Sequence, residues 1–544
     1  MNPKSPQLKP EKSFWKSFLD GEPAEADGST SFWGSFLDGE PSEPDPSPSS
    51  ATHFDPSKVY WAMNNLPARE ATKHYLVCGT VGSGKTKTIQ LFLQSIAPRF
   101  RRSHGPPEQL IVFDAKGDMI PRLAKLGLRP KNKNVWILHP FDKRAASWNL
   151  GEAIQTPAMA RYLASLFIGD EPNSTAPYFP NTAREIVYWV ALSLSHRRKK
   201  RGWTLRDLLN ALDSKENIAA VTSHLPRAKR VVAQHLADRR HFPGVLSTMA
   251  TKLGRFEEVA ALWATSKSRR SFSVTKFLKK KGVLILGHDP VLAESIWPIN
   301  SIILQAITNE ILRERETKAP RHWFVLDEFR AMGQVKCIRD LLNLGRSKGA
   351  SVMLGIQSVE GLVEIYGQSA TDEMLGLCST KTFLRAGGPT TAEWAERHFN
   401  RVRQVERTVS ETFGHEHSHS FSYQVQERSL FLPAMFLDLP LPQPGGLYGA
   451  ISDIPCLRTT LVTERPFDTV LEQCNEPTDE EISKQDAFMR KKPDEQIIKP
   501  WDDIEQTDFC DKLPVDPPPP PTPEPPKMTT REDQQKRRSK DKDS

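Results

Sequence analysis

The chain has 544 residues, 38% of them hydrophobic, with 74 lysines and arginines against 66 aspartates and glutamates. That length allows one large domain with tails or two to three ordinary domains, and no apolar run approaches the roughly 20 residues that cross a bilayer. The N-terminus lacks the apolar core of a signal peptide, and the six scattered cysteines form no C-x-x-C pair. We therefore expect a soluble protein of a reducing compartment, located in the cytoplasm.

Residues 1–52 are rich in Pro, Ser, Gly, Asp and Glu, a composition that does not form a core alone. They contain a repeat, SFWKSFLDGEP at 13–23 and SFWGSFLDGEP at 31–41. In each copy the bulky residues fall at i, i+1, i+4 and i+5, which gives one apolar stripe on a short helical turn. The repeats either dock on an unknown partner protein with avidity from duplication, or fold back on their own domain. The duplication favours a partner.

From residue 53 the chain has the pattern of an α/β fold, in which short apolar runs alternate with helical segments. Such runs are typical of parallel strands buried on both faces. We predict strands at 75–78, 110–113, 135–138, 283–286, 323–326, 351–355 and 380–384. We therefore expect a parallel-rich central sheet built from two parts of the chain, 53–171 and 277–465.

The strongest chemical signal is GTVGSGKT, which follows the first predicted strand and precedes a helical pattern. It fits G-x-x-x-x-G-K-[ST], a P-loop whose glycines let backbone amides point at phosphate oxygens. Lys85 is expected to reach the β- and γ-phosphates of ATP, and Thr86 to supply a hydroxyl ligand to Mg²⁺. The predicted nucleotide-binding residues are Gly79, Thr80, Val81, Gly82, Ser83, Gly84, Lys85, Thr86 and, from a later strand, Asp327.

A helix-rich segment, residues 172–276, lies between the third and fourth predicted strands. From Arg184 to Lys281 the chain has 22 lysines and arginines against 7 aspartates and glutamates, although its overall net charge is only +8. Like charges gathered in one segment repel unless a partner neutralises them. We interpret this segment as an all-α insertion that faces a polyanion; a solvated helical face is the alternative.

The run HWFVLDEF ends in Asp327 and Glu328. An aspartate at the carboxyl end of a strand can hold Mg²⁺, and the next glutamate can polarise the attacking water, so together with the P-loop the pattern predicts an ATPase. Arg346 could be an arginine finger that enters the site of a neighbouring subunit, or a surface arginine. Gln357, at the end of the next strand, could sense the γ-phosphate or orient the water, or have no such role. Our catalytic candidates are Lys85, Glu328, Arg346 and Gln357, with Thr86 and Asp327 as Mg²⁺ ligands.

Three further segments have patterns whose function is less specific. DAKGD, at 114–118, is either a loop that links nucleotide state to substrate contacts or a tight turn. HEHSH, at 415–419, has a spacing that could bind a metal, but it lacks companion ligands at metal-binding spacing, so we predict a polar loop. Residues 466–544 are polar, Pro-rich and finally charged, and we expect them to be mostly disordered.

In chain order, the P-loop, DAKGD, HPFDKRAASWNL, the helical insertion, VLDEFRAMGQV, LLNLGRSKGASVMLGIQS and IYG resemble TraG/TraD-type coupling ATPases of type IV secretion and conjugation. The resemblance covers roughly residues 55–460 and is most specific at 327–367. It implies a RecA-like motor that assembles as a homo-hexameric ring, with an inserted all-α domain facing DNA. It assigns phosphate and Mg²⁺ contacts to Lys85 and Thr86, the Walker B position to Asp327 and Glu328, the trans-acting arginine to Arg346 and the sensor to Gln357.

Members of that family usually begin with two membrane helices, and here the aromatic repeats take their place. We expect no direct membrane span, with recruitment to the inner membrane through a partner. The leading hypothesis is an ATP- and Mg²⁺-dependent motor that delivers relaxase-bound DNA to a secretion channel and contacts DNA through its phosphates, independently of sequence. The alternatives are a HerA- or FtsK-like motor in repair or segregation, and an ATP-switched adaptor that recruits proteins through the repeats.

Overall fold

The computed structural model describes residues 55–101, 105–169, 177–197, 202–265, 270–399, 401–412, 418–457, 459–489 and 498–511. The aromatic repeats, with His415 and His417 of HEHSH, therefore lie outside the described residues. None of the helices in the described ranges combines the length and the hydropathy that a bilayer crossing requires.

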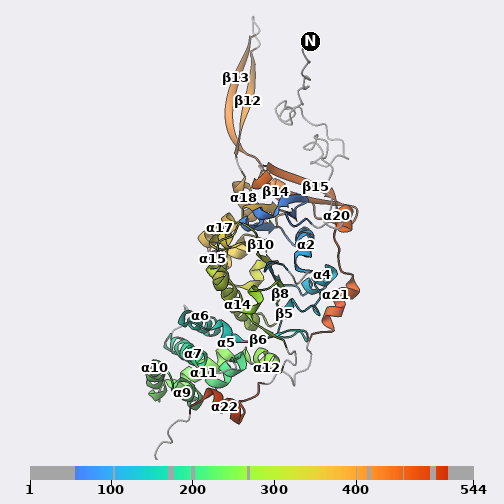
Figure 1. Ribbon diagram of the computed structural model, residues 1–544. Helices are drawn as coiled ribbons and strands as arrows, with labels where there is room; N and C mark the ends of the chain where they lie inside the picture. The colour runs from blue at the N-terminus through green and yellow to red at the C-terminus, as the bar shows by residue number, and fades with distance from the viewer. Residues whose placement is uncertain are drawn as a thin grey trace, which may run out of the picture.

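The centre of the described structure is a nine-stranded sheet, seven strands of which run parallel (Figure 1). In spatial order the parallel strands are β11 (Thr380–Phe383), β3 (Tyr75–Cys78), β10 (Ala350–Ile356), β9 (His322–Leu326), β4 (Gln109–Asp114), β8 (Gly282–Gly287) and β5 (Val135–Leu138). They coincide with the seven predicted runs to within about two residues at each end, an ordinary uncertainty for element boundaries. The prediction of a parallel-rich central sheet is confirmed.

Helices cover both faces of this sheet. Tyr75 and Val77 of β3 pack in the same core as α2 (Lys85–Ile96) and α4 (Met119–Lys125). Leu76 and Cys78, which alternate with them, pack in the core that contains α14 (Ala293–Arg313) and α15 (Cys337–Asn343). Burial on both faces explains why the strands are continuous apolar runs rather than alternating ones.

Strands that the sequence did not reveal extend the fold beyond β11. β14 (Leu447–Ile454) pairs antiparallel with β11, and β15 (Thr459–Pro466) pairs with β14. A long antiparallel ribbon, β12 (Arg401–Thr412) and β13 (Ser418–Ser429), projects from the body (Figure 1). These strands contain Gly, Ser, Thr and charged residues, so they lack the apolar runs that mark the buried parallel strands.

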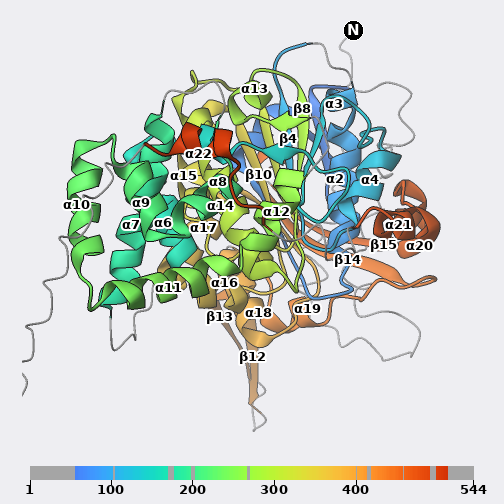
Figure 2. The same ribbon diagram turned by 90° about the horizontal axis from the view of Figure 1, so that it is seen from below.

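The basic segment folds into a helical unit that lies beside the sheet, with α10 at its outer end (Figures 1 and 2). Helices α6 and α11 both pack along α7, although α6 precedes the predicted 172–276 range. The unit comprises α6 (Pro157–Ile168), α7 (Tyr178–His196), α8 (Leu205–Leu212), α9 (Lys215–Thr222), α10 (Pro226–Ala237), α11 (Phe242–Gly254) and α12 (Glu257–Thr265).

The expectation of disorder after residue 466 is corrected for residues 466–489 and 498–511. They form α20 (Phe467–Gln473), α21 (Asp479–Asp486) and α22 (Asp503–Phe509), which pack on the body. Capping boxes begin α21 and α22. Trp501 stacks on Phe509 at 5.3 Å, and its Nε1 donates a 2.9 Å hydrogen bond to Oδ1 of buried Asp207 in α8. Amino-acid composition does not predict tertiary contacts of this kind.

We expect Trp501→Phe to lower the free energy of unfolding by about 1.5–3 kcal/mol, because the buried Asp207 carboxylate loses a donor. Trp501→Ala should cost more, since the ring contact with Phe509 is lost as well. Differential scanning calorimetry measures both effects. Trp394→Phe is the matched control, because its Nε1 bonds the exposed Asp372 and its loss should cost little. An unchanged transition for Trp501→Phe would contradict the docking of this segment.

Candidate nucleotide site

The P-loop connects the carboxyl end of β3 to the start of α2 and is anchored on both neighbouring strands. The Gly79 amide donates to the Ile356 carbonyl of β10 at 3.1 Å, and the Thr80 amide donates to the Arg385 carbonyl after β11 at 2.8 Å. Gly84 has a φ of +97°, and a Cβ there would lie 3.0 Å from the ring of buried Tyr448. Only glycine combines that left-handed backbone with so close an approach.

Lys85 is buried at the bottom of this loop, where its Nζ donates to the Gly79 carbonyl at 2.5 Å. Burial lowers the pKa of Lys85, while the carboxylates of Glu328 and Asp327 oppose that shift. The ammonium is therefore held inside the loop that would surround the phosphates.

The parallel register brings the other candidates to the same edge of the sheet. Gly355 and Ile356 of β10 pair with Val77 and Cys78 of β3, and Leu326 of β9 pairs with Phe113 of β4. Neighbouring strands lie about 4.8 Å apart, so the residues that follow each strand are neighbours as well. The carboxyl edge thus gathers the P-loop, Gln357, the Asp327–Glu328 pair and Asp114.

Asp327 is 1% exposed, and its Oδ1 has no hydrogen-bond partner among the described residues. Burial raises the pKa of Asp327, and the charges of Lys116 and Lys85 oppose that shift. A buried carboxylate oxygen without a donor, beside a P-loop, fits a divalent cation as its partner. Asp327 and Thr86 would hold Mg²⁺ here.

Glu328 has a left-handed backbone, with φ 57° and ψ 58°, which is uncommon for a residue other than glycine. Its Oε2 accepts a 2.5 Å hydrogen bond from Nε2 of Gln357. The structure therefore brings these two candidates into direct contact, a pairing that the sequence did not predict. The strained backbone and the amide together fix the direction of the carboxylate.

The DAKGD motif follows β4 at the same edge, so the loop lies beside the candidate site. Burial, and then the charge of Asp118, raise the pKa of Asp114 to about 7. The Asp114 carboxylate accepts hydrogen bonds of 3.3 Å from the Met119 amide, which holds the loop closed. Exposed Lys116 is close enough to influence both Asp327 and Lys85 electrostatically. The sequence already suggested a position near the nucleotide pocket, and the pairing of β4 with β9 brings the end of β4, where the motif begins, beside the strand that leads to Asp327.

Arg346 is not part of this arrangement. It lies exposed in a 3-10 helix, Gly345–Lys348, that precedes β10, whereas Gln357 follows the same strand. β10 has seven residues, and at about 3.3 Å per residue it separates Arg346 from its own P-loop by roughly 20 Å.

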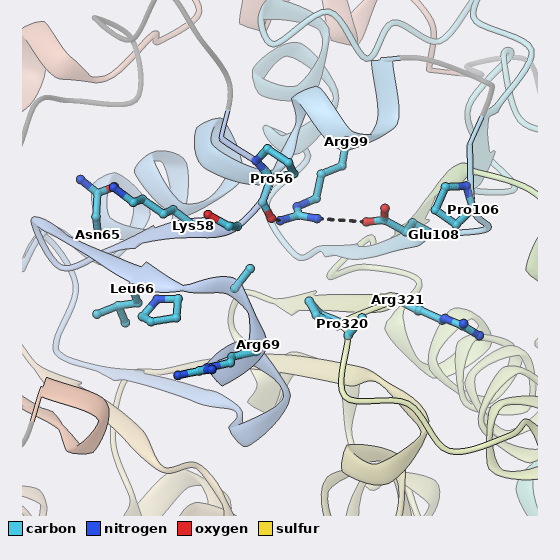
Figure 3. A pocket seen from close by; sticks show the side chains of 14 residues that line it. Pro56, Lys58, Asn65, Leu66, Arg69, Arg99, Pro106, Glu108, Pro320 and Arg321 are labelled. Atoms are coloured by element: carbon cyan, nitrogen blue, oxygen red, sulfur yellow. Dashed lines mark hydrogen bonds and ion pairs between the residues drawn. The ribbon is translucent and has the colours of Figure 1, made fainter.

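A pocket of about 610 Å³ opens among segments that precede the parallel strands, and it contains none of the predicted site residues (Figure 3). Its lining includes Lys58, Arg69, Arg99, Glu108 and Arg321, with Arg99 paired to Glu108 at 3.5 Å. The nucleotide site is therefore defined by the P-loop and the strand ends rather than by this cavity.

Residues 60–462 match the family model described as the type IV secretion-system coupling protein DNA-binding domain. The chain is 21% identical over 350 residues to the coupling protein TraD of Escherichia coli K12, covering 63% of this chain and 46% of TraD. It is 23% identical over 333 residues to VirD4 of Bartonella quintana, covering 57% of this chain and 50% of VirD4. The chain thus spans about half the length of these relatives.

Solved structures of the conjugative coupling protein TrwB share the fold at 17% identity. Unbound TrwB lacking its N-terminal segment gives a TM-score of 0.56 over 75% of this chain and 88% of that one. TrwB with ADP and Mg²⁺ gives 0.52 over 76% and 89%. The predicted RecA-like P-loop fold is confirmed. Since the family model matches residues 60–462, which include the seven parallel strands and the helical unit, the chain belongs to the type IV secretion-system coupling proteins.

Proposed function

We propose that this chain is an ATP-hydrolysing, DNA-translocating coupling protein that delivers relaxase-bound DNA to a type IV secretion machinery. The observation that carries the proposal is the meeting of Lys85, Asp327 and the Glu328–Gln357 pair at one sheet edge, in a member of this family. TrwB has been solved with a non-hydrolysable ATP analogue and with ADP and Mg²⁺, which supports ATP and Mg²⁺ as the ligands.

In this proposal the P-loop amides and Lys85 hold the phosphates, and bound Mg²⁺ neutralises their charge. Glu328 accepts a proton from the attacking water as general base. Gln357 keeps the Glu328 carboxylate directed at that water through its hydrogen bond. Tyr448 supports the first turn of α2, because its hydroxyl lies 2.8 Å from Oγ1 of Thr88.

Arg346 would act on the site of a neighbouring copy. It is exposed at the edge opposite to its own P-loop, so it can approach a γ-phosphate only across an interface between subunits. A head-to-tail ring, proposed here as a homo-hexamer, places the arginine-bearing edge of one subunit against the P-loop edge of the next.

The DNA contacts are proposed to lie on the helical unit. α10 buries Ala228, Val232 and Leu236 and exposes Arg227, Lys229 and Arg230, although the Arg227 guanidinium also lies over the Trp189 ring at 5.9 Å. Arg239 and Arg240, which follow it, are also exposed. A basic face at the outer end of the unit suits a phosphate backbone and reads no sequence.

The relaxase, the channel components and the inner-membrane recruitment are proposed from the family, and the partner of the repeats from their duplication. The aromatic repeats, which lie outside the described residues, are proposed to dock on a protein of that machinery.

We expect Lys85→Ala to abolish ATP binding, and Glu328→Gln to keep binding while kcat falls about 10²–10⁴-fold, because the general base is removed. Steady-state hydrolysis and binding of a fluorescent ATP analogue separate the two effects. Glu364→Gln is the matched control, since Glu364 pairs with Arg330 on the surface. A Glu328→Gln protein that hydrolyses ATP normally would contradict the general-base role, and one that no longer hydrolyses ATP but still supports DNA transfer would favour the adaptor alternative.

Arg346→Ala should lower kcat by about 10³-fold or more if the arginine acts in trans. Mixing Arg346→Ala with Lys85→Ala subunits should then restore hydrolysis, because roughly a quarter of the interfaces in a random ring combine an intact P-loop with an intact arginine. The assay is the ATPase rate against mixing ratio. Mixtures as inactive as either parent would rule out the trans-acting role.

Replacing Arg227, Lys229 and Arg230 with alanine should weaken DNA binding and reduce the slope of log affinity against log salt by about 2–3, at about 0.9 per phosphate contact on duplex DNA. Fluorescence anisotropy over a salt series measures the slope. Exposed Lys276, Lys279 and Lys280 lie outside the helical unit, and their replacement removes the same charge as a control. Equal losses in both triple variants would place DNA elsewhere or show a non-specific charge effect.

A further inference from the structure

Glu476 lies between the first turn of α2 and the middle of α4, the two helices that follow the P-loop and the DAKGD motif. Its carboxylate forms an ion pair with Lys87, the residue after Thr86 in α2. Its other oxygen accepts a 3.1 Å bond from Nη1 of Arg122 in α4. Burial works against ionisation, but the contacts with Lys87 and Arg122 hold the pKa of Glu476 below its usual value. One carboxylate therefore joins the P-loop helix to α4.

The connection continues from Arg122 into the DAKGD loop. Nε of Arg122 lies 3.1 Å from Oδ2 of Asp118, the last residue of that motif. The same loop carries Lys116 and is closed by the bonds of Asp114 to Met119. Asp114 ends β4 next to the strand that leads to Asp327. An uninterrupted series of polar contacts thus runs from α2 through Glu476 to the loop beside Asp327.

Glu476 is itself held in place by its neighbours in the chain. On α2, Gln90 donates to the Asn475 carbonyl at 3.1 Å, and Gln94 donates to the Gln473 carbonyl at 3.0 Å and accepts from the Asn475 amide at 3.1 Å. On α4, Lys125 pairs with Glu481 at 2.9 Å. We call residues 473–481 the bracket. α20 and α21, at its two ends, lie beside α2 and α4 (Figures 1 and 2).

We propose that Glu476 is a positioning residue for ATP hydrolysis, which sets the separation between the P-loop and the DAKGD loop across the phosphates. This inference rests on the proposed hydrolysis. Without the carboxylate, Lys87 and Arg122, whose side chains are 20% and 9% exposed, would lose the acid that they share, and Arg122 would keep only Asp118. Partly buried cations without a shared acid repel and draw in water, which would move α2 and α4 apart. The DAKGD loop would then shift relative to Asp327, and the electrostatic influence of Lys116 on Asp327 would change.

The test uses the full chain with Glu476→Gln, which keeps the shape of the side chain and removes its charge. We expect kcat to fall about 10-fold or more while KM changes less than about 3-fold, because misplacement by about 1 Å can cost up to 10²-fold in rate. Amide hydrogen exchange should become faster at residues 85–88 and 114–118. Glu481→Gln is the matched control, because it removes the other ion pair of the bracket on α4, which involves Lys125 at the last position of that helix.

A folded Glu476→Gln protein with kcat within about two-fold of wild type would overturn the proposal. Equal losses in Glu476→Gln and Glu481→Gln would also overturn it, because the bracket would then only stabilise the fold. If Glu476→Gln does not fold, Glu476→Asp replaces it, and the expected result is a lower kcat with an unchanged melting temperature. If the wild type hydrolyses no ATP, the proposed function fails, whereas the exchange measurement still decides whether Glu476 orders the two segments.

Discussion

The parallel pairing of β3, β10, β9 and β4 is the constraint on which the candidate site depends. Parallel strands end at one edge, so the P-loop, Gln357, the Asp327–Glu328 pair and Asp114 meet there although they are far apart in the sequence. The strands can lie side by side because helices bury both of their faces. The same burial also shields Asp114, Asp327 and Lys85 at the carboxyl edge from water.

The carboxyl edge of the sheet holds several ionisable side chains that are buried, and burial disfavours their charged forms. Burial raises the pKa values of Asp114 and Asp327 and lowers the pKa of Lys85. A nucleoside triphosphate with Mg²⁺ would provide phosphate oxygens for the Lys85 ammonium and a cation for the buried carboxylates. Further from the P-loop, the Glu476 carboxylate balances the positive charges of Lys87 and Arg122 in the same way. The opposite edge carries Arg346, which makes a second copy of the chain part of the proposed chemistry.

An element could be predicted from the sequence when the residues that determine it are close together in the chain. All seven parallel strands were predicted, because burial on both faces demands continuous apolar residues. β14 was not, since Gly449, Ser452 and Asp453 interrupt its apolar pattern. The C-terminal helices were taken for disorder because their composition is polar, while Trp501 and Phe509, which dock α22, have no periodic pattern around them. The Glu328–Gln357 contact required the pairing of β9 with β10 before it could be recognised.

The sequence by itself determined the P-loop, the strands of the parallel sheet and the basic character of the helical unit. Each of these depends on residues close together in the chain: a fixed backbone curl, a buried run, a local excess of charge. Only the tertiary structure decided that Gln357 bonds Glu328, that Arg346 lies at the far edge, and that Glu476 joins α2 to α4. Those relations depend on which strands pair and on which helices follow them. The role of Glu476 could not be predicted, because Lys87 and Arg122 are distant from it in the sequence and become its neighbours only in the fold.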